Sequence, residues 1–343
     1  MRLQRPRPLQ GRPSVSVVVP LYNYGRYLPE AVDSALQQPG VDVEVIIVDD
    51  ASTDGSQAVA RRLQRRDPRV TLIEHERNLR HIRTYNDGLA RASGEYLVLL
   101  SADDALTPGS LARSVALFEA HPRVGLVYGR IAAYGAPIPR PVANWWQVWA
   151  GGEWVRHVCR RGRNMIANPE VVVRADVYRD IGGYDLDLPH AADMLMWLQT
   201  AARSDIGFVG GPRQAVYRTH DTNMHVTAYI GATDDMTQVR DVYARFFADA
   251  GATLPGAGRM RELAMASVAR EALLRAALLG ADGAPPATVV ALRDFARRTS
   301  QRAPATAAWA WSAPGGRVPP GAIRAAERAR WKIRSRRTDL VGL

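Results

Sequence analysis

Several residue types are scarce in this sequence, and each shortage excludes a class of protein. The only cysteine among its 343 residues is Cys159, so the sequence holds neither an internal disulfide framework nor a cysteine-built zinc site. No window reaches the roughly 18 uninterrupted apolar residues that a membrane-spanning helix needs. The apolar stretch at 15–19 is also too short for a secretory signal. We therefore expect a cytoplasmic protein that meets a membrane only at its surface.

The charge of the chain is concentrated at its two ends. Its 45 basic residues, of which only Lys332 is a lysine, outnumber 34 acidic ones, so the net charge is +11. Residues 1–12 carry +4 and residues 319–343 carry +5, which leaves the chain between them nearly neutral. A neutral body argues against a specific nucleic-acid surface, whereas basic ends suit anionic lipid. The 47% of apolar residues is typical of a globular protein.

Between residue 14 and about residue 130, short apolar segments typical of strands alternate with segments that have the apolar period of helices. Continuously apolar, β-branched runs separated by helix-like segments indicate right-handed βαβ units, and therefore a mostly parallel sheet with helices on both faces. The fold class is α/β, and the ligands of such sheets bind at the carboxyl ends of the strands. The predicted strands lie at 15–19, 43–48, 70–73, 96–100 and 124–128, and the predicted helices at 26–37, 55–66, 82–92 and 109–119.

The pattern loosens after about residue 131. Residues 134–154, rich in Pro, Gly and Trp, are expected to form a long loop with one short helix. Helices are predicted at 176–181 and 190–204, a strand within 208–217, and a helical region from 233 onward. We therefore divide the chain into a basic tail at 1–13, an α/β domain at 14–230, and a helical region at 231–343 that ends in a basic amphipathic helix.

Pairs of acids follow two of the predicted strands. Asp49 and Asp50 end one strand, and Asp103 and Asp104 follow another. One such pair is most often a helix cap or a turn former. Two pairs at one sheet edge are different, because four carboxylates repel one another and lose hydration unless a cation or hydrogen-bond donors bind between them. The pattern therefore indicates a site for a metal and a nucleotide.

Four segments of the chain together resemble the ordered motifs of the family 2 glycosyltransferases, which have the GT-A fold. The resemblance covers about residues 14 to 225 and rests on the order and separation of the motifs. It implies inverting transfer of a sugar from a nucleotide diphosphate sugar donor to an acceptor hydroxyl, helped by Mn²⁺ or Mg²⁺. The segments are VSVVVPLYNYGRYLPEAVDSALQQ, VEVIIVDDASTDGS, GLARASGEYLVLLSADDALTPGSL and NPEVVVRADVYRDIGGYD.

The resemblance assigns the nucleotide to the first two motifs and part of the third. Pro20, Tyr22 and Asn23, on the loop after the first strand, would line the nucleoside pocket, although Pro20 and Asn23 are also residues that simply shape a turn. Asp50 would accept a hydrogen bond from the base, and Asp103 would face the ribose or the metal.

The metal and the diphosphate are assigned to Asp104 and to the segment at 217–225. Asp104 would bind Mn²⁺ or Mg²⁺ together with the phosphates, since hard cations prefer oxygen ligands. Arg218 would approach the diphosphate, and His220 would add a metal ligand. The chain departs from many relatives at Ser101, where they have an aspartate. Arg80 and His81 either reach phosphate or base or are solvated loop residues, and we expect the latter.

The acceptor side is assigned to the fourth motif and to the helix that follows it. Asp193 is the candidate catalytic base, with the alternative that it is only the helix N-cap, and the usual preceding Glu is replaced by Ala192. Asp185 is the second candidate for the base. The loop at the donor sugar and the acceptor comprises Gly182, Gly183, Tyr184 and Asp185, where paired glycines allow close approach of a ligand.

Two tryptophan-containing segments lie outside the motifs. Trp145, Trp146 and Trp149 either stack on acceptor sugars, rest at a lipid interface or anchor a locally packed loop. The helix near 320–337, basic and preceded by Trp309 and Trp311, suits an anionic membrane surface, with a solvated helical face as the alternative.

The sequence therefore predicts a metal-dependent inverting glycosyltransferase that uses a glycan or lipid-linked acceptor. It would act in cell-surface glycan or glycolipid synthesis, peripherally at the inner face of the cell membrane. The alternative is a catalytically inactive nucleotide-sugar binding or scaffold protein on the same fold, with Ser101 and Ala192 as marks of a lost site. A dinucleotide-dependent oxidoreductase is disfavoured, because no G-x-G-x-x-G follows the first strand.

Overall fold

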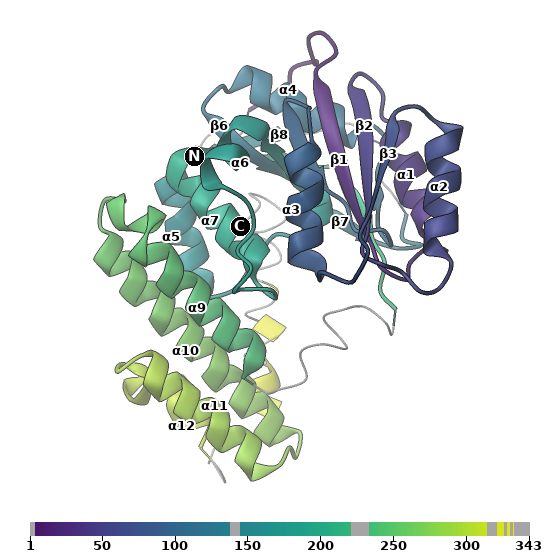
Figure 1. Cartoon of the computed structure of the whole chain (residues 1–343). Helices are drawn as coiled ribbons and strands as arrows, with labels where there is room; N and C mark the ends of the chain where they lie inside the picture. Colours follow the sequence, from purple (N-terminus) through teal and green to yellow (C-terminus); the bar gives the residue numbers. More distant parts are fainter. Residues whose placement is uncertain are drawn as a thin grey trace. The chain divides into compact units, whose positions relative to one another are not determined.

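The structure, a computed structural model, describes residues 4–137, 145–220 and 233–313, together with 321–325, 328, 329 and 332. It divides into two compact units (Figure 1). Unit 1 comprises Met1–Gly151 and Ile166–His220, and unit 2 comprises Gly152–Met165 and Asp221–Leu343. Residues 152–165, which the sequence pattern groups with the α/β domain, thus belong to the helical unit.

Within the described residues, unit 1 is built on a sheet of eight strands. In spatial order these are β3 (Val70–Glu74), β2 (Asp42–Asp49), β1 (Ser14–Leu21), β4 (Tyr96–Leu99), β9 (Val172–Arg174), β6 (Val124–Tyr128), β10 (Asp205–Gly210) and β8 (Trp145–Trp149). Strands β1 to β4 pair in parallel, as do β6 and β10, while β9 and β8 are antiparallel to their neighbours. The predicted mostly parallel α/β fold is therefore confirmed.

Helices cover both faces of the sheet because successive strand residues point to opposite sides. Val17 and Val19 share a buried cluster with residues of α1, while Val18 packs toward Gly88 of α3 on the other face. A Cβ at Gly88 would lie 2.4 Å from Val18, so the helix approaches the sheet as closely as only glycine allows. The helical elements are α1 (Leu28–Leu36), α2 (Ser56–Arg66), α3 (His81–Arg91), α4 (Ser110–Ala120), η1 (Asn168–Glu170), α6 (Ala175–Ile181) and α7 (Ala192–Arg203).

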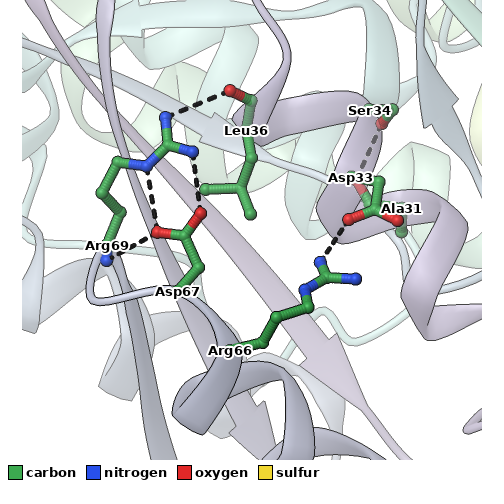
Figure 2. Close-up of polar contacts among 7 residues, drawn as sticks. All are labelled: Ala31, Asp33, Ser34, Leu36, Arg66, Asp67 and Arg69. Carbon is green, nitrogen blue, oxygen red and sulfur yellow. Dashed lines mark hydrogen bonds and ion pairs between the residues drawn. The ribbon is translucent and has the colours of Figure 1, made fainter.

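Charged contacts tie the end of α1 to the turn between α2 and β3 (Figure 2). Arg69 donates to the Asp67 carboxylate and to the carbonyl oxygen of Leu36, and Arg66 forms an ion pair with Asp33. The hydrogen bonds from Arg69 lower the pKa of Asp67 to about 2. These contacts lie near the amino end of β3, away from the carboxyl ends of the strands, and link α1 to the end of α2 and the start of β3.

A second sheet within the described residues joins three short strands in the order β5 (Ala105–Leu106), β11 (Ala215–Tyr217) and β7 (Ile131–Ala133). Strand β5 directly follows Asp103 and Asp104, and β11 directly precedes Arg218. The antiparallel pairing of β11 with β5 therefore brings Arg218 beside the two acids.

The tryptophan-rich segment contains a strand, which differs from the expected long loop with one short helix. Trp145–Trp149 forms β8, which pairs with β10, and Trp146 and Trp149 are buried. Gln4 of the N-terminal tail adds a bridge to Trp146. β-branched and aromatic residues favour strands, so the aromatic run pairs at the sheet edge and packs locally. Local packing is thus the alternative that the structure supports.

The described part of unit 2 is helical. Its elements are α5 (Gly151–Arg161), α9 (Asp234–Ala248), η2 (Ala250–Thr253), α10 (Ala257–Ala281), α11 (Pro286–Thr299), η3 (Ala303–Ala305) and α12 (Ala307–Trp311). α5 joins this unit through hydrogen bonds from the Tyr243 hydroxyl to the Val158 carbonyl and from Ser267 to the Arg160 carbonyl. No helix among the described residues is long and apolar enough to cross a membrane. Most of the predicted basic helix at 320–337 lies outside the described residues.

Candidate active site

The acids predicted to form the site lie at the carboxyl ends of β2 and β4. Asp50 follows β2, and Asp103 and Asp104 lie in the turn between β4 and β5, where all three side chains are buried. Because β2, β1 and β4 are neighbours and parallel, these residues share one edge of the sheet. The structure therefore gathers acids from two distant motifs at one edge, as the sequence pattern predicts.

The two carboxylate oxygens of Asp104 differ in their hydrogen bonding. Its Oδ1 accepts a hydrogen bond of 3.0 Å from the backbone N–H of Arg218, while its buried Oδ2 has no hydrogen-bond partner among the described residues. Burial, followed by the nearby charge of Asp103, raises the pKa of Asp104 to about 8. The negative form of this side chain therefore needs a cation or a donor at Oδ2.

His220 contacts Asp103. Its Nε2 lies 3.0 Å from Oδ2 of Asp103, and its ring stacks on Tyr27 and meets the edge of Tyr24. Across the ranges that the structure describes, no group of three or more His, Cys, Asp or Glu side chains is arranged to hold a metal. The unused oxygen of Asp104 nevertheless fits a cation that takes most of its ligands from elsewhere, such as a diphosphate.

Arg218 is held by three kinds of contact. Its Nε donates to the carbonyl oxygen of Asp103 at 3.0 Å, and its terminal nitrogen pairs with the Glu30 carboxylate. The guanidinium also lies 3.4 Å from the ring centre of Tyr134 and 4.8 Å from that of Tyr27. Stacking and hydrogen bonds fix this cation beside the acid pair, where it is suited to meet an anionic ligand.

The first motif supplies a rigid turn and one exposed aromatic ring. Pro20 lies within β1 opposite Val48, and not on the loop that the sequence suggests, whereas Asn23 follows the strand with a positive φ of 58°. The Asn23 side chain accepts a hydrogen bond of 2.7 Å from the backbone N–H of Thr53, so this residue does shape the turn. The ring of Tyr22 is 46% exposed beside it.

Asp50 is oriented by two donors at the same oxygen. Its Oδ1 accepts from the backbone N–H of Leu79 at 2.7 Å and lies 2.9 Å from Nδ1 of His75. The other ring nitrogen of His75, whose side chain is 8% exposed, lies 3.2 Å from the Asp87 carboxylate. His75 is a site residue that the motif comparison missed, because a single histidine after a strand carries no recognisable signal.

Asp193 lies in the first turn of α7 and is half-buried. The N-cap of this helix is Ala191, so the interpretation of Asp193 as the cap is wrong. Its Oδ1 accepts a hydrogen bond from the backbone N–H of Met194 at 2.7 Å. Four residues further on, the buried Trp197 lies on the same face of the helix. Asp193 is thus held in the first turn of α7, on the face of the helix that carries the buried Trp197.

The paired glycines have the conformation for which glycine is needed. Gly182 and Gly183 have φ values of 88° and 104°. Tyr184 is buried, and Oδ1 of Asp185 accepts from the backbone N–H of Asp187 at 2.9 Å, which closes a tight turn. His81 is a half-buried residue of α3 that contacts the carbonyl oxygen of Pro189, so the expectation of a solvated loop residue is wrong for it, and burial lowers its pKa.

The sequence of the chain is similar to those of known proteins. The family model described as glycosyl transferase family 2 matches residues 16–177. An uncharacterized glycosyltransferase of Nostoc is 39% identical over 33% of this chain and 35% of its own length. An uncharacterized protein of Mycobacterium tuberculosis is 30% identical over 63% of this chain and 70% of its own length. The succinoglycan biosynthesis protein ExoO of Rhizobium meliloti is 39% identical over 30% of this chain and 29% of that protein.

Solved structures share the fold at lower sequence identity. The mannosyltransferase from Pyrobaculum calidifontis, solved with GDP-Man and Mn²⁺, superposes with a TM-score of 0.58 and 20% identity over 94% of this chain and 83% of that one. TarS from S. aureus, solved with UDP-GlcNAc, gives a TM-score of 0.57 and 16% identity over 84% of this chain and 91% of that one. With its GT-A architecture and its family match, the chain belongs to glycosyl transferase family 2.

Proposed function

We propose that the protein transfers a sugar, with inversion, from a nucleoside diphosphate sugar to an acceptor hydroxyl. The observation that carries the proposal is the buried Asp104, whose Oδ1 accepts from the backbone N–H of Arg218 while its Oδ2 has no hydrogen-bond partner among the described residues. Relatives named for polysaccharide biosynthesis support a role in cell-surface glycan or glycolipid synthesis. The acceptor would be a glycan or a lipid-linked glycan, reached from the cytoplasmic face of a membrane to which the basic residues of 319–343 would bind.

Asp104, together with Asp103, would hold Mn²⁺ or Mg²⁺, and His220 would join them after exchanging its contact with Asp103. Two solved relatives of the same fold carry a nucleotide sugar, and one of them also carries Mn²⁺. Such a cation stabilises the negative charge on the leaving diphosphate. Arg218 would bind the diphosphate. To do so, its guanidinium would either contact the diphosphate and the Glu30 carboxylate together or release Glu30.

The nucleoside would lie against Tyr22 and Asn23, at the end of β1. Because both donors to Asp50 use its Oδ1, the remaining Oδ2 is the oxygen that would accept from the base. Asp193 would take the proton from the acceptor hydroxyl, with Asp185 as the second candidate, and the loop from Gly182 to Asp185 would border the two sugars.

Thermal unfolding with UDP, GDP, dTDP and CDP, each with and without Mn²⁺, tests this function. A ligand at 100 times its dissociation constant adds about 2.7 kcal/mol to stability. One diphosphate should stabilise the wild type chiefly with metal, and Asp104→Asn should lose that response. Asp180→Asn, on the exposed face of α6, removes the same charge away from the site and should keep it.

An inactive nucleotide-sugar binder is the second candidate, favoured by Ser101 and Ala192. It predicts the same stabilisation by a diphosphate but no release of diphosphate from the matching sugar donor. If no diphosphate stabilises the wild type with or without metal, both the transferase and the binder are refuted.

A further inference from the structure

One side chain of α3 binds the backbone of the loop from Gly182 to Asp185. Oδ1 of Asn86 accepts from the backbone N–H of Tyr184 at 2.8 Å, and its Nδ2 donates to the carbonyl oxygen of the same residue at 2.9 Å. The Asn86 amide thus pairs with Tyr184 as a strand neighbour would. Oδ1 also accepts from the Tyr178 hydroxyl at 3.3 Å.

Gly183 makes this contact sterically possible. A Cβ at Gly183 would lie 2.9 Å from Oδ1 of Asn86, and the φ of 104° is itself unfavourable for other residues. At the neighbouring Gly182 a Cβ would meet nothing within 4 Å. The second glycine of the pair therefore admits Asn86, whereas the first only ends α6.

The Tyr184 ring extends the contact to α7. It lies with its centre 6.4 Å from that of Trp197, edge to face, and 5.8 Å from that of Tyr85 on α3. Trp197 is one turn along the same face of α7 as Asp193. Burial, and after it the charge of Asp193, raises the pKa of Tyr184. Asn86, Tyr184 and Trp197 of α7 therefore form one packed series, one turn beyond Asp193.

His81 contacts the segment between Asp185 and the start of α7. Its Nε2 lies 2.7 Å from the carbonyl oxygen of Pro189, so this nitrogen carries a proton and donates. His81 and Tyr85 are four residues apart on α3 and their rings meet edge to face. Since α3 packs on β1 and β2, the loop is fixed relative to the strands that carry the nucleotide side of the site.

From this geometry we infer that Asn86 is a positioning residue for sugar transfer, which sets the loop from Gly182 to Ala191 and the first turn of α7 against the nucleotide-binding edge. The inference rests on the proposed function. The sequence also marks this position. Asn86, Asp87 and Gly88 are consecutive in the middle of α3, although all three residue types disfavour helix formation. A misplacement of about 1 Å at a reacting group can lower turnover about 100-fold.

The test compares wild type with Asn86→Ala, which loses both hydrogen bonds to Tyr184, and Asn86→Asp, which keeps the acceptor but loses the donor. Diphosphate affinity, release of diphosphate from the matching nucleotide sugar with water as acceptor, and amide hydrogen exchange are measured on the full chain. We expect kcat to fall about 10- to 100-fold in both variants, with diphosphate Kd within about 2-fold and faster exchange in residues 184–191. His81→Gln, which keeps a donor for Pro189, should retain more activity than His81→Ala.

An unchanged kcat, or a loss explained entirely by weaker diphosphate binding, would overturn the inference. Unchanged exchange at residues 184–191 in Asn86→Ala would also overturn it, and this readout needs no turnover. A wild type that binds no diphosphate and releases none refutes the proposed function instead, and the two failures are thereby distinguished.

Discussion

The guanidinium of Arg218 forms an ion pair with the carboxylate of Glu30, which lies 188 residues earlier in the chain. Glu30 is in the first turn of α1, directly after the loop that carries Tyr22 and Asn23. The Glu30 carboxylate is thus already paired with the Arg218 guanidinium that the proposed diphosphate would bind. The pair joins the first and last segments of unit 1 across the site.

Removal of this carboxylate should strengthen diphosphate binding. In Glu30→Gln the guanidinium no longer has to leave an ion pair, and because Glu30 is about half exposed the gain should be small, about 2- to 5-fold in Kd. Titration calorimetry with the stabilising diphosphate measures it. The control is Asp33→Asn. Asp33 lies on the same helix as Glu30, and its variant loses the ion pair with Arg66 but should leave the diphosphate Kd unchanged.

Asp193→Asn should abolish most transfer while leaving the donor bound. Loss of a general base typically costs about 10²- to 10⁴-fold in rate, and the amide keeps the size of the side chain and an acceptor for the Met194 N–H. Diphosphate release from the sugar donor, measured beside diphosphate affinity, separates the two effects. The parallel variant Asp185→Asn should lose less than about 10-fold, and the reverse ranking would move the base to Asp185.

Gly183→Ala and Gly182→Ala should differ in stability although both positions have a positive φ. Each alanine meets the conformational penalty of about 1 kcal/mol. Only Gly183→Ala also forces its Cβ against Asn86, so its total cost should reach about 2–3 kcal/mol. Denaturant unfolding of both variants checks this, and equal midpoints would contradict the close contact with Asn86.

Buried Glu170 should make the free energy of unfolding depend on pH. Burial raises its pKa to about 8, so the folded protein keeps a proton that the unfolded chain loses above about pH 4.5. Stability from this group is therefore lost as pH rises from about 4.5 to 8. Glu170→Gln should be more stable than wild type at pH 8 by about 1 kcal/mol or more, with a smaller difference at pH 5. Glu76→Gln, at an exposed position, should show no such trend.

Local pattern was enough to predict the elements around the site. The helices expected at 55–66, 82–92 and 109–119 each lie within one residue of α2, α3 and α4, because periodicity of apolar residues reports which face of an element is buried. The same reasoning failed at Trp145–Trp149. Its composition predicts a loop, whereas the partner that makes it a strand, β10, lies more than fifty residues away in the sequence.

The sequence by itself determined the α/β order and placed Asp50, Asp103 and Asp104 after strands, since hydrophobic period and strand-end chemistry are local properties. Only the tertiary structure decided that Arg218 contacts Glu30 and Asp104 and that Asn86 holds Tyr184. These contacts join residues about a hundred or more positions apart, and no local pattern specifies them. They arise because packing of α3 and pairing of β11 with β5 fix where each side chain ends.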